Sequence, residues 1–210
     1  MISQEEHDLI LQKCKGIPPA KGMYLVKDYI ENLLLTVLDF QMHNVSVEKA
    51  ITHYRKYRYD EVRTLSDLKE LLSKYNNDKE GNTVVAQYLW GNRHWTRVGL
   101  LRNLVTFFES IDITSQEVLS DWAKMSDFKR CFQGKIPGMG YAIYQWLIMR
   151  QGIETIKPDL HVRRFVESIL HRSDITDEQL VATLEDIARE LGLKAYELDW
   201  RIWEYQRAKV

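Results

Sequence analysis

The sequence has few of the residues that build disulfide-rich, metal-binding or membrane proteins. Its 210 residues include only 2 Cys, 4 Pro and 10 Gly. Cys14 and Cys131 match no metal-binding or redox spacing, so we expect buried thiols in a reducing compartment. No apolar run approaches the length of a membrane span, and acidic residues stand where a signal peptide would be basic. We therefore expect a cytoplasmic protein that does not contact membranes.

An excess of charge of one sign is also absent. The chain has 29 Lys and Arg against 30 Asp and Glu, a net charge of −1, so the whole-chain charge does not indicate a nucleic-acid partner. A local basic surface is still possible, because a ligand responds to the charge of the patch that it meets and not to the net charge of the chain. The 6 Trp, 11 Tyr and 6 Phe are numerous enough that we expect some aromatic side chains to act outside the core.

Helical periodicity runs through almost the whole chain, and alternating β-branched runs are scarce. We therefore predict an all-α fold, with helix starts marked by Ser66, Thr114 or Ser115, Asp159 and Thr176. The predicted helices are 2–14, 24–41, 45–57, 65–75, 80–90, 94–110, 114–124, 126–133, 139–151, 160–172, 176–191 and 195–207.

The stretch "IPGMG" (136–140) leaves almost no loop between two predicted helices. Glycines tolerate positive φ and let another backbone approach, and the following helix adds its N-terminal N–H groups. Such a turn can hold a phosphate without a charged side chain, and Lys135 adds basic character nearby. The alternative at this point is a tight helical hairpin in which glycine only ends a helix.

The stretch "KPDLH" (157–161) begins another predicted helix. Pro158 keeps the entry extended, and Asp159 is the predicted N-cap. Capping alone is the ordinary role of such an aspartate. However, a carboxylate held by backbone N–H groups is also aimed, which suits the stabilisation of a positively charged transition state.

These two stretches resemble the signatures of the helix-hairpin-helix (HhH-GPD) DNA glycosylases of the endonuclease III superfamily, which have an "LPGVG"-type hairpin and a "VD-T-H" helix start. Two further segments are similar to that family: "LLLTVLDFQMHNVSVEKAITHY" (33–54) and "YLWGNRHWTRVGLLRNLVTFF" (88–108). The four segments stand in the family's order and cover the chain from about residue 24 onward.

The resemblance implies two helical domains with a DNA-binding cleft between them. Residues 26–148 would form a six-helix barrel that ends in the helix-hairpin-helix, and residues 1–25 with 149–210 the second domain. The family extrudes a nucleotide from double-stranded DNA and cuts its N-glycosidic bond. We expect the protein to act on duplex DNA as a monomer.

The resemblance also implies roles for single residues. Asp159 would be the catalytic carboxylate, and Gln41 would fill the space that the extruded base leaves. Asn92, Arg93 and His94 would wedge into the duplex. Gly138 and Gly140, with Lys135, would hold a phosphate, and the resemblance leaves open a monovalent cation on the hairpin carbonyls. The predicted base pocket consists of residues of the hairpin's second helix: Tyr141, Ala142, Gln145 and Trp146.

Three departures from the family pattern bear on the chemistry. Ala142 stands where bifunctional members have a lysine, and alanine cannot form an imine. Tyr144 replaces a small residue between the hairpin helices. Cys14 and Cys131 alone cannot ligate the iron–sulfur cluster that many members hold with four cysteines. We therefore predict a monofunctional DNA glycosylase without a cofactor. The alternatives are a catalytically silent DNA-binding protein and a helical scaffold for protein partners.

Overall fold

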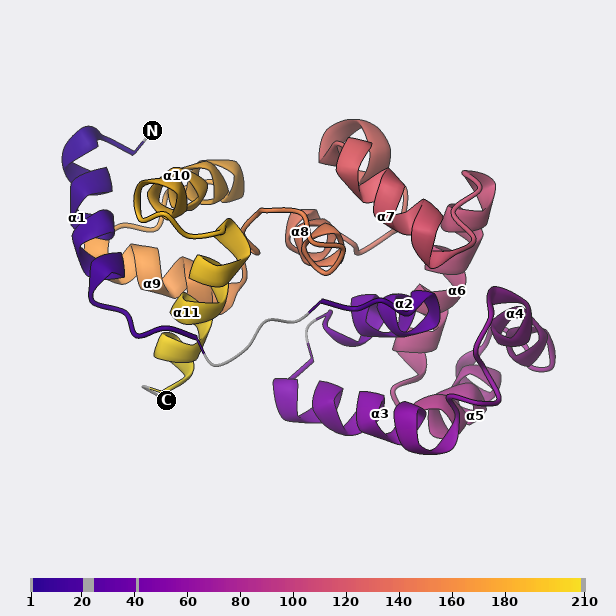
Figure 1. Ribbon diagram of the computed structural model, residues 1–210. Coiled ribbons are helices and arrows are strands. Elements are labelled where there is room, and N and C mark those ends of the chain that lie inside the picture. The colour runs from indigo at the N-terminus through magenta and orange to yellow at the C-terminus, as the bar shows by residue number, and fades with distance from the viewer. Residues whose placement is uncertain (1, 21–24, 41, 209–210) are drawn as a thin grey trace. The chain divides into compact units, whose positions relative to one another are not determined.

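A computed structural model describes residues 2–20, 25–40 and 42–208 (Figure 1). In this part of the chain it contains eleven α-helices and one π-helix and no strand, which confirms the all-α prediction. The helices are α1 (Gln4–Lys15), α2 (Tyr29–Leu38), α3 (Asn44–Tyr57), α4 (Leu65–Ser73), α5 (Lys79–Trp90), α6 (Trp95–Ser110), α7 (Gln116–Met125), the π-helix η1 (Phe128–Phe132), α8 (Tyr141–Met149), α9 (Leu160–Leu170), α10 (Asp177–Glu190) and α11 (Ala195–Arg207).

The chain divides into two compact units. One is Val26–Ile143, and the other combines Met1–Leu25 with Tyr144–Val210. The division falls inside α8, at Tyr144. The domain ranges that the resemblance implies, 26–148 and 1–25 with 149–210, stay a prediction.

The unit Val26–Ile143 is built around α2. Every residue of this helix is buried, because its sequence "YIENLLLTVL" is apolar on nearly all sides. Helices α3, α4 and α6 pack against it, and α5 packs against α3 and α6. The helix begins later than its predicted start at residue 24, because Asp28 caps it by accepting the N–H of Glu31 at 2.7 Å.

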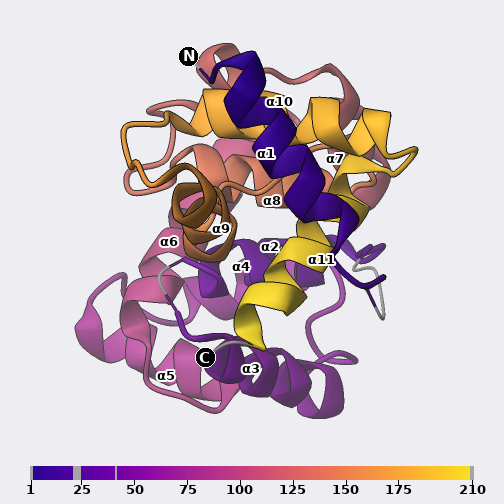
Figure 2. The ribbon, with the colours of Figure 1, turned by 90° about the vertical axis from the view of Figure 1, so that its left-hand side faces the viewer.

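The other unit groups α1 with α9, α10 and α11, and Figure 2 shows α1 lying across this group. Amphipathic α9 turns Val162, Phe165 and Val166 inward. An ion pair of 3.0 Å between Glu6 of α1 and Arg172 after α9 joins the first segment to the rest of the unit. Together with the buried Ile10 and Cys14, this contact ties a helix at one end of the sequence to a unit made of the other end.

The caps follow most of the predicted start signals. Ser115, Asp159 and Thr176 are N-caps, and Thr176 forms a capping box with Gln179. The prediction for Ser66 is wrong: Thr64 caps α4 in a capping box with Asp67. None of the helices described in the chain is both long and apolar enough to cross a membrane.

Candidate functional site

The chain enters α9 through a tight turn. The N–H of Asp159 donates to the carbonyl of Lys157 at 2.7 Å, which closes the turn over Pro158. Oδ1 of Asp159 then caps the helix by accepting the N–H groups of His161 at 2.8 Å and Val162 at 3.0 Å. The Asp159 side chain is still 19% exposed. Its carboxylate is therefore fixed in direction and accessible.

A cation lies beside this carboxylate. The ammonium nitrogen of Lys157 is 3.9 Å from Oδ2 of Asp159, and the lysine side chain is only 14% exposed. The same nitrogen lies over the indole of Trp146, 5.0 Å from the ring centroid. Arg150, which is 1% exposed, also lies over this indole at 5.0 Å. Trp146 therefore holds Lys157 next to Asp159 through cation–π contact.

A second carboxyl group lies beneath the turn. Asp199 of α11 is 6% exposed, and its Oδ1 accepts the N–H of Lys157 at 2.8 Å. Burial and the negative charge of Asp159 raise the pKa of Asp199 to about 8, although the N–H bond and the charge of Lys157 oppose the rise. The two aspartates thus form a pair in which the buried member is mostly protonated at neutral pH.

An aromatic surface adjoins the first turn of α9. His161 packs edge-on against Trp203, with ring centroids 6.1 Å apart, and Trp203 packs against Trp200 at 5.4 Å. Arg207 covers Trp203 at 5.0 Å. All three rings are half-buried. The surface next to Asp159 can therefore offer flat aromatic faces as well as charge.

The predicted phosphate-binding hairpin is anchored by two buried side chains. Ile136 is 1% and Met139 4% exposed, and the N–H of Met139 donates to the carbonyl of Ile136 at 3.1 Å. Pro137, Gly138 and Gly140 are exposed between and after these anchors. Gly138 has φ +84°, which requires glycine here, and a Cβ added at Gly140 would meet nothing within 4 Å. The backbone of the turn is therefore presented to solvent.

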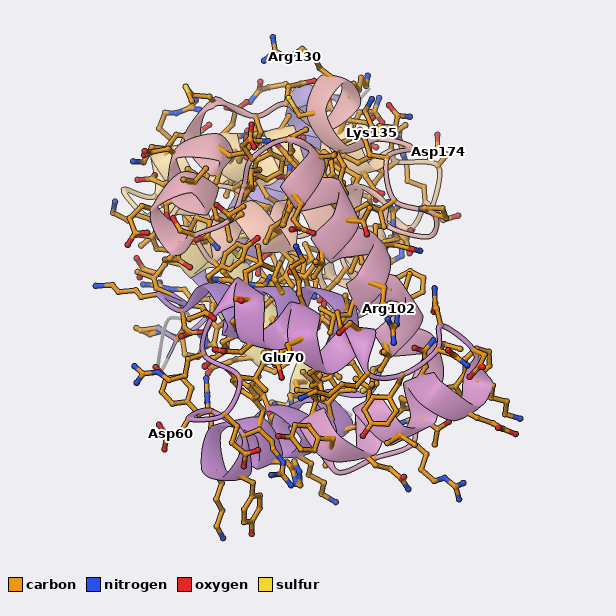
Figure 3. The ribbon with its side chains drawn as sticks, turned by 90° about the vertical axis from the view of Figure 1, so that its right-hand side faces the viewer. Asp60, Glu70, Arg102, Arg130, Lys135 and Asp174 are labelled. Atoms are coloured by element: carbon orange, nitrogen blue, oxygen red, sulfur yellow. The ribbon has the colours of Figure 1, made fainter. Side chains whose placement is uncertain are left out.

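Basic side chains precede this hairpin in the sequence. Lys135 precedes it, and Arg130 lies on η1, the short π-helix that replaces the regular helix predicted for 126–133. Both are exposed, and Figure 3 shows them extending outward. Phe40 lies beside Gly138: a Cβ on that glycine would be 3.7 Å from the phenyl ring, and Arg97 covers the same ring at 5.1 Å. A phosphate at the hairpin would thus meet positive charge.

The predicted wedge lies in the sharp turn between α5 and α6. Gly91 has φ +66° and packs so closely on His53 that a Cβ would stand 2.7 Å from Nδ1 of the imidazole. Oδ1 of Asn92 accepts the N–H of His94 at 3.0 Å, and Arg93 and His94 are exposed. The loop is therefore held at its base and free at its tip.

The predicted base-pocket residues differ in accessibility. Tyr141, Ala142 and Trp146 are half-buried, whereas Gln145 is buried with 5% exposure. Tyr141 packs edge-on against Phe128, with centroids 5.0 Å apart. Gln41, the residue predicted to fill the gap in the duplex, lies outside the described residues. The role of these residues as a base pocket stays a prediction.

Sequence reasoning missed Asp199 and Arg97. A signal for Asp199 was present: it lies on the same helical stripe as Leu198 and Ile202, both fully buried, and a carboxylate on an apolar stripe indicates a functional or paired group. For Arg97 there was no such signal, because its place over Phe40 depends on packing between α2 and α6.

The cysteines bear on the prediction that the protein holds no iron–sulfur cluster, which stays a prediction. An iron–sulfur cluster needs four ligands and deprotonated thiols. The chain has two cysteines, and burial raises the pKa of Cys14 to about 12. Among the residues that the structure describes, no three His, Cys, Asp or Glu side chains gather as a metal site requires.

Comparison with known proteins gives a family and a fold. Residues 8–207 match a family described as a domain of unknown function, DUF8548. No curated protein matches the sequence. A solved structure described as a trapped covalent intermediate of endonuclease III and DNA, an estranged-adenine complex, is similar with a TM-score of 0.54. The similarity covers 99% of this chain and 88% of that chain at 20% identity, which shows a common fold.

Proposed function

The chain belongs to the family described as a domain of unknown function, DUF8548, and we propose that it is a monofunctional DNA glycosylase. It would extrude a damaged or modified base from double-stranded DNA and hydrolyse the N-glycosidic bond. The endonuclease III fold supports a DNA substrate, because the similar structure is a DNA complex. The observation that carries the enzymatic part is Asp159, a carboxylate that is fixed by two backbone N–H groups and accessible.

Binding to the duplex would use backbone more than side chains. The exposed Gly138 and Gly140 can let a phosphate approach the N–H groups at the start of α8, and Lys135 adds charge. Contacts of this kind set position without reading sequence. Arg93 and His94, at the free tip of their loop, would insert where the base leaves the stack.

The chemical step would depend on charge. As the bond from C1′ to the base nitrogen breaks, positive charge develops on the sugar, and the carboxylate of Asp159 stabilises it. Water supplies the oxygen that bonds to C1′, one of its protons goes to the departing base, and Asp159 orients or deprotonates this water. Ala142 offers no amine, so the product would be an intact abasic site.

A specific observation favours a second candidate, a glycosylase with lyase activity. The Lys157 amine lies 3.9 Å from Asp159 and could attack C1′ in place of the lysine that position 142 lacks. We rank it second because the amine is engaged by Asp159 and Trp146 and is 14% exposed.

The test is a panel of duplex oligonucleotides with alkylated, deaminated, oxidised and mismatched bases, each incubated with the protein at neutral pH. Mass spectrometry would detect the released base, and gel analysis after alkali would detect the abasic site. Release from one class of base supports the proposal. Tight, salt-sensitive binding without release would indicate a silent DNA-binding protein, and a lack of binding would indicate a scaffold.

A further inference from the structure

The buried carboxyl group of Asp199 is an unusual feature of the unit that contains Asp159. An aspartate is seldom buried unless it is paired, because removing its charge from water is costly. Asp199 is 6% exposed, and within the described residues its one hydrogen-bond donor is the backbone N–H of Lys157. Among the side chains that the structure describes, none forms with Asp199 the close ion pair that normally accompanies a buried carboxylate, although the charge of Lys157 acts on it.

The hydrogen bonds around Asp199 form a chain that ends at Asp159. Asp199 on α11 accepts the N–H of Lys157 at 2.8 Å, and the carbonyl of Lys157 accepts the N–H of Asp159 at 2.7 Å. Asp159 in turn caps α9. The position of the Asp159 carboxylate therefore depends on a contact that α11 makes with the turn before it.

Two charged groups act on Asp199, and further charged groups of the same unit are engaged with other partners. The Asp159 carboxylate and the Lys157 ammonium act on it from the turn. α8 contributes Arg150, which lies over Trp146. α10, which packs against α11, directs Glu185 at the connection before the turn, where it accepts from the hydroxyl of Thr155 at 2.8 Å. On α11 itself, Arg201 pairs with Glu197.

We propose that Asp199 is a positioning residue for base excision: from its buried place on α11 it accepts the N–H of Lys157 and so holds the Lys157–Asp159 turn that aims the Asp159 carboxylate. This inference rests on the proposed glycosylase function. It assigns the catalytic role to Asp159 and the positioning role to Asp199. When the environment moves the pKa values of two neighbouring carboxyl groups apart, one group can act as an ionised carboxylate and the other as a neutral acid. The raised pKa of Asp199 agrees with that division.

Alkaline pH would undo the arrangement. Once Asp199 loses its proton, a buried negative charge acts on the negative charge of Asp159, and their repulsion favours opening of the turn. Asp159 then loses its orientation. Misplacement of a reacting group by about 1 Å can slow a reaction by roughly 100-fold. We therefore expect base release by the wild type to fall as pH rises through about 8.

Asp199→Asn separates the ability of the residue to accept a hydrogen bond from its ability to ionise. Asparagine keeps an oxygen that accepts the Lys157 N–H but cannot ionise. We expect D199N to release base at neutral pH at a rate within about threefold of wild type, below the ~1.4 kcal/mol that a tenfold change represents, and to lack the alkaline fall. Asp199→Ala, which loses the acceptor, should slow single-turnover release by about 10- to 100-fold at neutral pH, with duplex affinity unchanged.

The experiment measures single-turnover base release from pH 6 to 10 for wild type, D199N, D199A and a control, Asp174→Asn, whose carboxylate is 75% exposed. An alkaline fall that is identical in wild type and D199N would overturn the proposal, as would a D199A rate equal to wild type. Carboxyl-carbon NMR of Asp199 in the wild type, assigned with D199N, tests the neutral state without activity. If no variant releases any base, the proposed function fails, whereas a titration near pH 8 still supports the neutral acid and one near pH 4 rejects it.

Discussion

The ammonium nitrogen of Lys157 lies 3.9 Å from Oδ2 of Asp159, and the indole of Trp146 lies against the same nitrogen. In the proposed reaction, an amine in this position would decide whether the protein stops at the abasic site. The Asp159 carboxylate and the Trp146 ring both engage the ammonium group, and an amine acts as a nucleophile only after it gives up its proton and leaves such contacts. The proximity therefore favours electrostatic support of Asp159 over covalent chemistry.

The first prediction concerns covalent trapping. Base release by the wild type should leave an abasic site that only added alkali cleaves, and borohydride should trap no protein–DNA adduct. The control is Lys157→Gln, which keeps a polar side chain, one atom shorter than lysine, but has no amine to form an imine. An adduct that appears with the wild type and disappears with K157Q would make Lys157 the nucleophile and the enzyme bifunctional.

Replacement of Asp159, the proposed catalytic carboxylate, should separate chemistry from binding. Asp159→Asn can still cap α9, but it supplies no negative charge to the developing cation. We expect base release to slow by about 100-fold or more, with duplex affinity and thermal stability close to wild type. Excision within about tenfold of wild type, roughly 1.4 kcal/mol in the barrier, would remove Asp159 from the catalytic role.

Gly140 offers a clean test of the hairpin, because a Cβ there meets nothing within 4 Å and the protein itself has room for it. Gly140→Ala should leave the fold and melting temperature unchanged but weaken binding to all duplexes alike, by about tenfold, since a methyl group would keep the phosphate from the backbone. Gly16→Ala is the matched control in the other unit, where a Cβ makes only an ordinary 3.6 Å contact. Equal affinity of G140A and G16A would make the hairpin merely structural.

The exposed tip of the 91–94 loop should contribute to base extrusion rather than to chemistry. Arg93→Ala is expected to slow release several-fold from a duplex in which the target base is paired. The loss should shrink when the target is mismatched, because less pairing energy must then be overcome. Kinetics on matched and mismatched duplexes check this, and an equal loss on both would place Arg93 outside the extrusion step.

The titration of Asp199 predicts a pH dependence of stability. Its pKa is about 8 in the folded protein, against about 3.9 in an unfolded chain. Between these values the folded state binds one more proton, so the free energy of unfolding falls as pH rises, by about 1.4 kcal/mol for each pH unit.

Asp199→Asn has no such proton. Urea unfolding at pH 5, 6 and 7 should therefore show D199N gaining stability relative to wild type by about 1.4 kcal/mol for each pH unit. Glu185, whose pKa burial also raises, is present in both proteins and cancels in the difference. A difference that does not change with pH would mean that Asp199 is ionised throughout this range.

Much of the architecture follows from the sequence alone, because helices depend on local periodicity and on caps that a few residues provide. The all-α class is such a result, and so are the caps at Ser115, Asp159 and Thr176. The same local signals gave a wrong N-cap at Ser66. Thr64 also has a hydroxyl group, and Asp67 completes a capping box with it. Local sequence limits the possible N-cap residues to a few. Which of them caps the helix depends on whether the residue three positions later can complete a capping box.

The sequence also pointed to Asp159 and the hairpin, since their motifs are contiguous and can be read without a fold. What only the tertiary structure decided is the surroundings of that carboxylate. Lys157, Trp146 and Asp199 come from a turn and two helices that are separate in the chain, and no local pattern brings them together. Burial and the charge of a neighbour determine the protonation of Asp199, and both depend on how α9 and α11 pack. The motifs identify the candidate reacting group, Asp159, whereas the packing of the helices determines the charged groups that surround it.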